Sequence, residues 1–508
     1  MNPVGTRNPY GHGGEVTAHD AAARLLTPIW TALGGRRTDV DRVEFTGNRA
    51  LKSAFPVTDL AAASFGAAGL ALACLVDTAA VPGSAPARVR VDRELAGGWF
   101  HLPIGPSIPV NGTPRGITPG GTPWMAEFRT ADDRWLRVQM LFPSLRARVV
   151  KRLGVAETTE AVAAAIRRLD AEEAEQMLVD AGAAVAVGRG LREWREHPQG
   201  RAVAAEPIVA VEEGGAPRRR WRPAPGRPLA GLRVLDLTRV ITGPVATRFL
   251  AACGAEVLRL DAPGSDESVM EFGAGTDLVL GKRWAYLDIA SAEGRARFLE
   301  LLADADVLVH GYRPGAIDGL VSREERAAAQ PGLVEVEFNA YGWTGPWARR
   351  SGFDSLVQYS SGLADETTRW ALEDPENRVP INALGKLVPA DRPRHLPVEA
   401  IDFSTGYQVA AAALTGLVRL VTTGRGSLSR LSLARTAALL ADAGRPTEEP
   451  ELHLPLTGPL EDPVYATPHG PVRRLCFPVE VDGTPLFWER PYEPVGSSSP
   501  RWTTANPV

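Results

Sequence analysis

Residues 229–261 read LAGLRVLDLTRVITGPVATRFLAACGAEVLRLD, and this stretch predicts one βαβ unit. VLDL and EVLRL are short apolar runs typical of buried strands, and the stretch between them places Val245, Phe249 and Leu250 on one helical face. Such a unit belongs to a parallel α/β sheet. The loop after the first strand holds only one glycine, Gly243, where a dinucleotide site needs G-x-G-x-x-G. The segment therefore predicts a doubly wound fold without an NAD site.

The alternation of strands and helices continues downstream. AYLDI, DVLVH and LVEVEF are typical of strands, and SAEGRARFLELLADA is typical of a helix. We predict the α/β class, with a Rossmann-like, mostly parallel sheet as the core in residues 228–440 and a smaller α+β domain in residues 1–205. Residues 206–227 are rich in Pro, Gly and charge, which predicts an exposed linker. We expect residues 441–508 to form a tail that packs back on the fold.

Composition bounds the possible functions. The chain has 508 residues, 44% of them hydrophobic and 23% charged, which is enough for more than one domain. A net charge of -4 provides no basic field for nucleic acid or an anionic membrane. Cys74, Cys253 and Cys476 lie far apart and form no CxxC pair, and the histidines show no metal-ligand spacing. We expect a cytoplasmic protein with no metal, no permanently bound cofactor, no nucleic-acid partner and no membrane partner.

Three further motifs follow the opening βαβ segment. They are GKRWAYLDIASAEGRARFLELLADADVLVHGYRPGAIDGL, VEFNAYGWTGPWARRSGFDSLVQYSSGLA and AIDFSTGYQVAAAALTGLVRL. In this order the four segments resemble the class III CoA-transferase family, which includes formyl-CoA and carnitine CoA-transferases and alpha-methylacyl-CoA racemase. The resemblance implies transfer of CoA from an acyl-CoA thioester to a carboxylic acid through an aspartyl anhydride and an aspartyl thioester. It also leads us to expect a homodimer.

The catalytic candidates are an acid and a glycine pair. Asp402 begins DFSTG at the start of a predicted helix, where a carboxylate alone would simply cap the helix. The resemblance instead implies that Asp402 is the nucleophile. It further implies that Gly120 and Gly121, in TPGGTPW, form a loop over the aspartate, where glycine lets backbone N–H groups approach a developing oxyanion.

The resemblance also implies a CoA site at the strand tips, the usual ligand edge of such a sheet. Four residues depart from the family pattern: Gly311 and Tyr312 stand where an Asn-Phe pair is usual, Gly319 where a basic residue is expected, and Ala262 where some members have an arginine. Basic side chains in this set would pair with the phosphates of CoA. The implied CoA-binding residues are Ile241, Thr242, Lys282, Arg283, Gly311, Tyr312, Arg313, Asn339 and Ala340.

The N-terminal half contains a partial repeat. Residues 56–76 align with 397–420 so that Asp59 lies over Asp402, and residues 87–100 align with 428–441. We interpret the N-terminal half as rearranged or partly duplicated, with small-domain sequence placed before the core. Asp402 is preferred as the nucleophile because it follows the core and keeps the STG turn, whereas Asp59 is followed by LAAAS and remains the alternative.

Several other functions compete with transfer. The racemase branch of the family has a histidine in a GHD motif, but here the motif is SGFD, so Phe353 removes one base of a two-base proton transfer. A non-catalytic homologue that binds CoA esters, or a subunit of a larger CoA-transferase, is the main alternative. An NAD-dependent dehydrogenase would use Asp261 on the ribose hydroxyls, and the single loop glycine argues against it.

Overall fold

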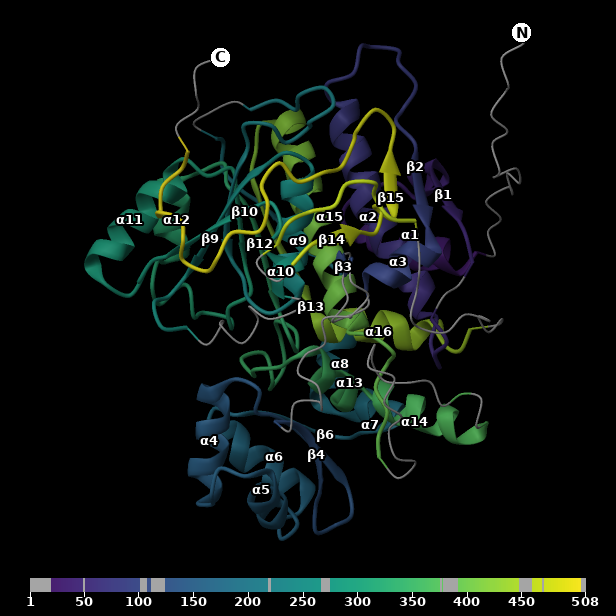
Figure 1. Ribbon diagram of the computed structural model, residues 1–508, viewed down its shortest axis with the longest axis vertical. Helices are drawn as coiled ribbons and strands as arrows, with labels where there is room; N and C mark the ends of the chain where they lie inside the picture. The colour runs from purple at the N-terminus through teal and green to yellow at the C-terminus, as the bar shows by residue number, and fades with distance from the viewer. Residues whose placement is uncertain are drawn as a thin grey trace.

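The computed structural model describes residues 20–48, 51–100, 107–110, 124–217, 221–265, 275–374, 377, 392–446, 459–467 and 470–503. Its centre is a seven-stranded sheet (Figure 1). Six strands are parallel, and the edge strand β7 is antiparallel to β13. The strand order is that of doubly wound sheets, and the predicted α/β class is confirmed. Across the sheet the strands are β10 (Lys282–Tyr286), β9 (Glu256–Asp261), β8 (Arg233–Leu237), β11 (Val307–His310), β12 (Val334–Asn339), β13 (Ser427–Ser432) and β7 (Ala210–Glu213).

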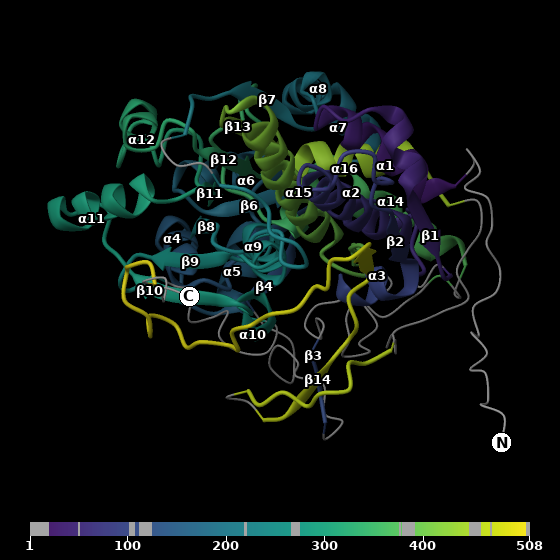
Figure 2. The same ribbon diagram turned by 90° about the horizontal axis from the view of Figure 1, so that it is seen from above.

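Helices cover both faces of this sheet (Figure 2). On β8, Val234 packs with the core that includes α9 (Thr242–Ala252) and α15 (Ala400–Thr423). Its neighbour Leu235 packs with the opposite cluster, which includes α11 (Ala292–Ala303). Side chains therefore alternate between two apolar faces, as expected for a strand buried on both sides. The short helices α10 (Gly275–Leu278) and α12 (Arg323–Ala329) precede β10 and β12.

Residues 20–100 share the core of the central sheet. Their longest helix, α2 (Val57–Asp77), lies beside α15 in both views (Figures 1 and 2), and the Ser64 and Ser404 hydroxyls are 2.8 Å apart. Among the described residues, α2 alone is long and apolar enough for a membrane span, but 89% of its most apolar window is buried inside the protein. The other elements here are α1 (Ala21–Ala32), the 3-10 helix η1 (Arg37–Arg42), β1 (Val43–Thr46), β2 (Val89–Asp92) and α3 (Arg93–Trp99).

A smaller α+β unit lies at one end of the molecule (Figure 1) and has its own apolar core. It consists of the antiparallel strands β4 (Met125–Arg129), β5 (Trp135–Gln139) and β6 (Ala184–Val187) with α4 (Pro143–Leu153), α5 (Thr159–Ile166) and α6 (Ala171–Asp180). We call it the small domain. The predicted single N-terminal domain thus divides into a part that joins the main core and this small domain. Between the small domain and the main core lie α7 (Leu191–Glu196), α8 (Pro198–Ala205), α13 (Asp354–Ser361), α14 (Leu363–Glu373) and α16 (Leu433–Ala443).

Two other segments join distant parts of the chain. The segment 206–227 differs from the predicted exposed linker, because it contributes β7 to the sheet edge and Trp221 to the core. At the C-terminal end, β14 (Val472–Arg474) pairs with β3 (Ser107–Pro109), and β15 (Val479–Val481) pairs with β2. The chain then reaches α11, where Trp502 Nε1 donates to the Leu301 carbonyl at 3.0 Å.

Candidate active site

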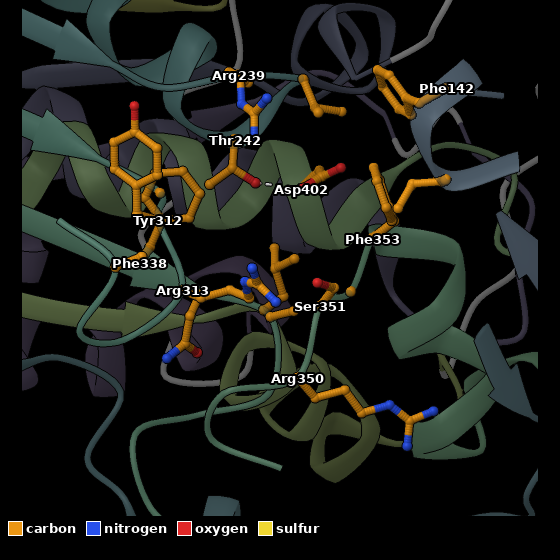
Figure 3. Close-up of a pocket in the computed structure, with 18 of the residues that line it drawn as sticks. Phe142, Arg239, Thr242, Tyr312, Arg313, Phe338, Arg350, Ser351, Phe353 and Asp402 are labelled. Carbon is orange, nitrogen blue, oxygen red and sulfur yellow. Dashed lines mark hydrogen bonds between the residues drawn. The ribbon is translucent and has the colours of Figure 1, made fainter. Parts of the chain in front are cut away.

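A cavity of about 480 Å³ opens at the carboxyl ends of β8, β11 and β12 (Figure 3). The helices after β8 and β11 cover opposite faces of the sheet, so the cavity lies at the switch point where open α/β sheets bind ligands. The small domain supplies its other wall through the first turns of α4. The lining residues are Phe142, Ser144, Leu145, Arg148, Leu237, Arg239, Val240, Thr242, Gly311, Tyr312, Arg313, Ala316, Phe338, Asn339, Ala340, Arg350, Ser351, Gly352, Phe353, Asp402 and Leu433.

Asp402 is the only acidic side chain among the described residues that line this cavity. It is the third residue of α15 and is 6% exposed. Thr242 Oγ1, at the start of α9, donates a hydrogen bond to Asp402 Oδ1 (Figure 3). Burial raises the pKa of Asp402 well above its ordinary value, and the nearby carboxylates of Asp354 and Glu399 raise it further. The geometry thus presents a poorly solvated and therefore basic carboxylate to the cavity.

Asp354 fixes the position of Asp402. Its Oδ2 accepts hydrogen bonds from the backbone N–H groups of Ile401 and Asp402, at 2.8 and 2.9 Å. Gln358 donates to its other oxygen. Burial raises the pKa of Asp354 to about 6, and burial together with the Asp354 carboxylate raises the pKa of Glu399 to about 7. Three acids therefore surround the first turn of α15, and the sequence analysis assigned a role only to Asp402.

The loop between β8 and α9 is strained where it meets the cavity. Val240 has φ +67°, a left-handed conformation that a β-branched residue adopts rarely. Two residues later, α9 begins at Thr242, the residue that bonds Asp402. A Cβ atom on Gly243 would lie 2.2 Å from Thr238 Cβ, so only glycine fits at that position. Packing therefore requires glycine at position 243, the second residue of α9, because its backbone approaches Thr238 too closely for a side chain.

The structure brings six of the nine predicted CoA-binding residues to the cavity: Thr242, Gly311, Tyr312, Arg313, Asn339 and Ala340. Ile241 lies in the apolar core. The buried Lys282 ammonium is 3.0 Å from Asp236 Oδ2 and 2.9 Å from the Pro244 carbonyl oxygen, and burial lowers its pKa to about 8.

Arg283 also lies away from the cavity. It is 3.3 Å from Glu256 and donates to the backbone carbonyls of Ser499 and Arg501 in the C-terminal tail. The charges of Lys282 and Arg283 therefore serve internal contacts. Gly120 and Gly121, the predicted oxyanion loop, lie outside the described residues.

Two arginines from the strand-tip loops border the cavity: Arg313, which is among the predicted CoA-binding residues, and Arg239, which is not. Arg239 and Arg313 are exposed side chains from the loops after β8 and β11. The position of Arg239 two residues after VLDL was a signal available in the sequence. Arg350 lines the cavity but points away from Asp402 (Figure 3), and its guanidinium bonds Glu175 in the small domain at 2.8 Å. The small-domain residues Phe142, Ser144, Leu145 and Arg148 gave no local sequence signal, because long-range packing brings them here.

Asp59 occupies an equivalent helix position but a different environment. Pro56 (φ −75°, ψ 63°) and Glu399 (φ −73°, ψ 60°) precede α2 and α15 in the same inverse γ-turn, and each acid is the third residue of its helix. The two helices therefore begin with the same local geometry. The Asp59 side chain is fully buried, lies 3.6 Å from Arg93 Nε and does not line the cavity.

The dehydrogenase alternative loses its ribose-binding acid. Asp261 is 4% exposed, and its Oδ2 accepts from Arg259 Nε at 2.9 Å and from Trp284 Nε1 at 2.5 Å. Its carboxylate is therefore held within the sheet and directed at its own neighbours. A dinucleotide site would use an acid free to bind the ribose and a glycine-rich loop after the first strand. Here Asp261 is engaged by its neighbours and only one glycine follows β8, so neither feature is present.

Comparisons with known proteins show a family to which part of the chain is similar. Residues 229–448 match the model of CoA-transferase family III. The chain is 40% identical over 154 residues to acetyl-coenzyme A transferase nodX of Hypoxylon pulicicidum, covering 28% of this chain and 24% of that protein. It is 31% identical over 210 residues to human succinyl-CoA:glutarate CoA-transferase, covering 39% and 44%. The chain thus spans less than half the length of these curated relatives.

One solved structure that resembles the chain is the hypothetical protein Rv3272 of Mycobacterium tuberculosis. The two are 26% identical, and the match covers 43% of this chain and 59% of that chain with a TM-score of 0.36.

Proposed function

We propose, from the match of residues 229–448 to the model of CoA-transferase family III, that this chain transfers CoA from an acyl-CoA thioester to a carboxylic acid. The observation that carries the proposal is the position of Asp402. It is the one acid lining the described part of the cavity, and it stands at the switch point of the sheet. We assign it the role of nucleophile.

The reaction proceeds in two symmetrical halves. The Asp402 carboxylate attacks the thioester carbonyl, the C–S bond breaks, and a mixed anhydride and CoA thiolate form. The thiolate then attacks the Asp402 acyl carbon, which gives an aspartyl thioester and releases the donor carboxylate. The acceptor carboxylate attacks this thioester to form a second anhydride, and the thiolate attacks the acceptor acyl carbon. A new acyl-CoA leaves, and Asp402 returns as a carboxylate.

The surroundings of Asp402 suit this chemistry. Burial and the neighbouring acids raise its pKa, so its ionised form is a stronger base and nucleophile than an exposed carboxylate. Thr242 and the Asp354-anchored helix turn hold the attacking oxygens in place. Low exposure also limits the access of water to the anhydride. Gly120 and Gly121 remain the predicted oxyanion donors.

The remaining substrate contacts follow from charge and shape. Exposed Arg239 and Arg313 attract the phosphates of CoA, in the place of Lys282 and Arg283. Phe353 puts a hydrocarbon ring where the racemase branch has a base, so proton transfer across an α-carbon is disfavoured. A cytoplasmic homodimer remains our expectation for the assembled enzyme, and a non-catalytic CoA-ester-binding subunit remains the main alternative.

The experiment compares Asp402→Asn with Asp59→Asn in the full chain. Transfer between acyl-CoA and a panel of carboxylates should fall by several orders of magnitude in Asp402→Asn, because the covalent route is lost. Asp59→Asn should retain most activity, since Asp59 lies outside the cavity. Hydroxylamine trapping during turnover, read by mass spectrometry, should modify Asp402. Modification at Asp59, or full activity of Asp402→Asn, would refute the assignment.

A further inference from the structure

The cavity has two chemically different ends on either side of Asp402. In Figure 3, Tyr312, Phe338 and the two arginines Arg239 and Arg313 lie on one side, and Phe142 and Phe353 lie on the other. A CoA thioester is highly anionic at its nucleotide and must place its carbonyl carbon at Asp402. The arginines therefore define the nucleotide side, and the acyl group extends toward the phenylalanines.

The acyl side is a hydrocarbon wall formed jointly by two parts of the chain. Phe142 precedes α4 of the small domain, Phe353 precedes α13, and their rings stack with centroids 5.7 Å apart and planes 23° apart. Phe142 is 7% exposed. Leu145 and Phe353 pack in turn against a buried cluster that includes Leu356. An apolar group placed here removes hydrocarbon surface from water on both sides of the contact.

Two further arginines line the cavity, Arg148 and Arg350, and both make contacts within the protein. The Arg350 guanidinium is held by Glu175 and by the Val185 carbonyl, and Arg148 Nη1 donates to the Gly182 carbonyl at 2.8 Å. Directly behind Phe353 lies the buried acid Asp354. A distal carboxylate would lose water beside phenyl rings and a like charge, which is unfavourable.

We infer that the carboxylic acid to which this chain transfers CoA is an apolar monocarboxylic acid of several carbons, selected by the Phe142–Phe353 pair. This inference rests on the proposed function and specifies its substrate class. It assigns Phe142 and Phe353 as specificity-determining residues. Short dicarboxylic acids are predicted to be poor acceptors.

The test measures kcat/KM for CoA transfer from acetyl-CoA to butyrate, hexanoate, phenylacetate, succinate and glutarate. Each methylene that becomes buried should raise kcat/KM about 4-fold. Hexanoate and phenylacetate should therefore exceed both dicarboxylates by at least about 10-fold. In Phe353→Ala, the ratio of hexanoate to butyrate should fall toward one, and Phe353→Leu should restore most of it because it keeps an apolar side chain.

Phe487→Ala is the matched control, because Phe487 is 44% exposed and lies outside the cavity. It should keep the wild-type preference. A wild-type preference for succinate or glutarate would overturn the inference while leaving the transferase proposal intact, and this measurement needs no variant that must fold. Absence of transfer to every acid, together with no hydroxylamine adduct on Asp402, would instead refute the proposed function.

Discussion

Replacement of Glu399 by Gln should stabilise the fold and shift the pH dependence of activity. Burial and the Asp354 carboxylate raise the pKa of Glu399 from 4.5 to about 7. Each pKa unit corresponds to about 1.4 kcal/mol, so ionised Glu399 costs the folded state at most about 3 kcal/mol. Below pH 4 the residue is protonated in both states and costs nothing. As pH rises through 4.5 the unfolded chain releases the proton first, so wild-type stability falls until the folded carboxyl has ionised near pH 7.

Glutamine keeps the shape of the protonated acid and never ionises. The free energy of unfolding of Glu399→Gln, measured in urea, should therefore exceed that of wild type by an amount that grows from pH 5 to pH 8.5, to about 3 kcal/mol at most. Asp402 also loses a like-charged neighbour, so the acid limb of its kcat/KM profile should move to lower pH. Glu480→Gln, at a side chain that is 72% exposed, should leave that limb in place. A stability difference that stays constant with pH would refute the reasoning.

Three further predictions concern other contacts. Arg239→Gln and Arg313→Gln should each raise KM for acyl-CoA about 10-fold in steady-state assays. Arg283→Gln should leave KM unchanged, because Arg283 lies outside the cavity. Equal effects of all three substitutions would contradict this location of the site. Arg350→Met should lower the free energy of unfolding by about 2 kcal/mol in urea, because buried Glu175 then keeps one cationic partner, Arg189, in place of two. Val240→Gly should change that free energy by less than about 1 kcal/mol, since relief of its positive φ offsets the lost side chain. The matched Val245→Gly, buried inside α9, should cost about 3 kcal/mol or more.

The sequence predicted those parts of the fold that depend on local patterns. The strands in VLDL, EVLRL and DVLVH are β8, β9 and β11, because apolar runs between turn residues identify buried strands. Composition was misleading at 206–227, where Pro, Gly and charge predicted a linker but long-range pairing with β13 makes a strand. The resemblance implied that Lys282 binds a phosphate of CoA, but its ammonium pairs with Asp236 in the structure. Residue type alone does not reveal that partner. Of the cavity, the sequence predicted the strand-tip loops, and the resemblance implied that the small domain closes the site, but neither identified the residues of that wall, Phe142, Ser144, Leu145 and Arg148.

The packing of α2 against α15 has a consequence for synthesis of the chain. Ser64 and Ser404 are separated by 340 residues, so α2 leaves the ribosome long before the helix that covers it exists. At about 5–20 residues per second, translation of the intervening chain takes about 17–70 s. The small domain has its own core and can fold during that interval. The apolar face of α2 that packs against α15 remains uncovered during this whole interval. A nascent chain stalled before residue 400 should therefore bind chaperones and aggregate more readily than the released protein.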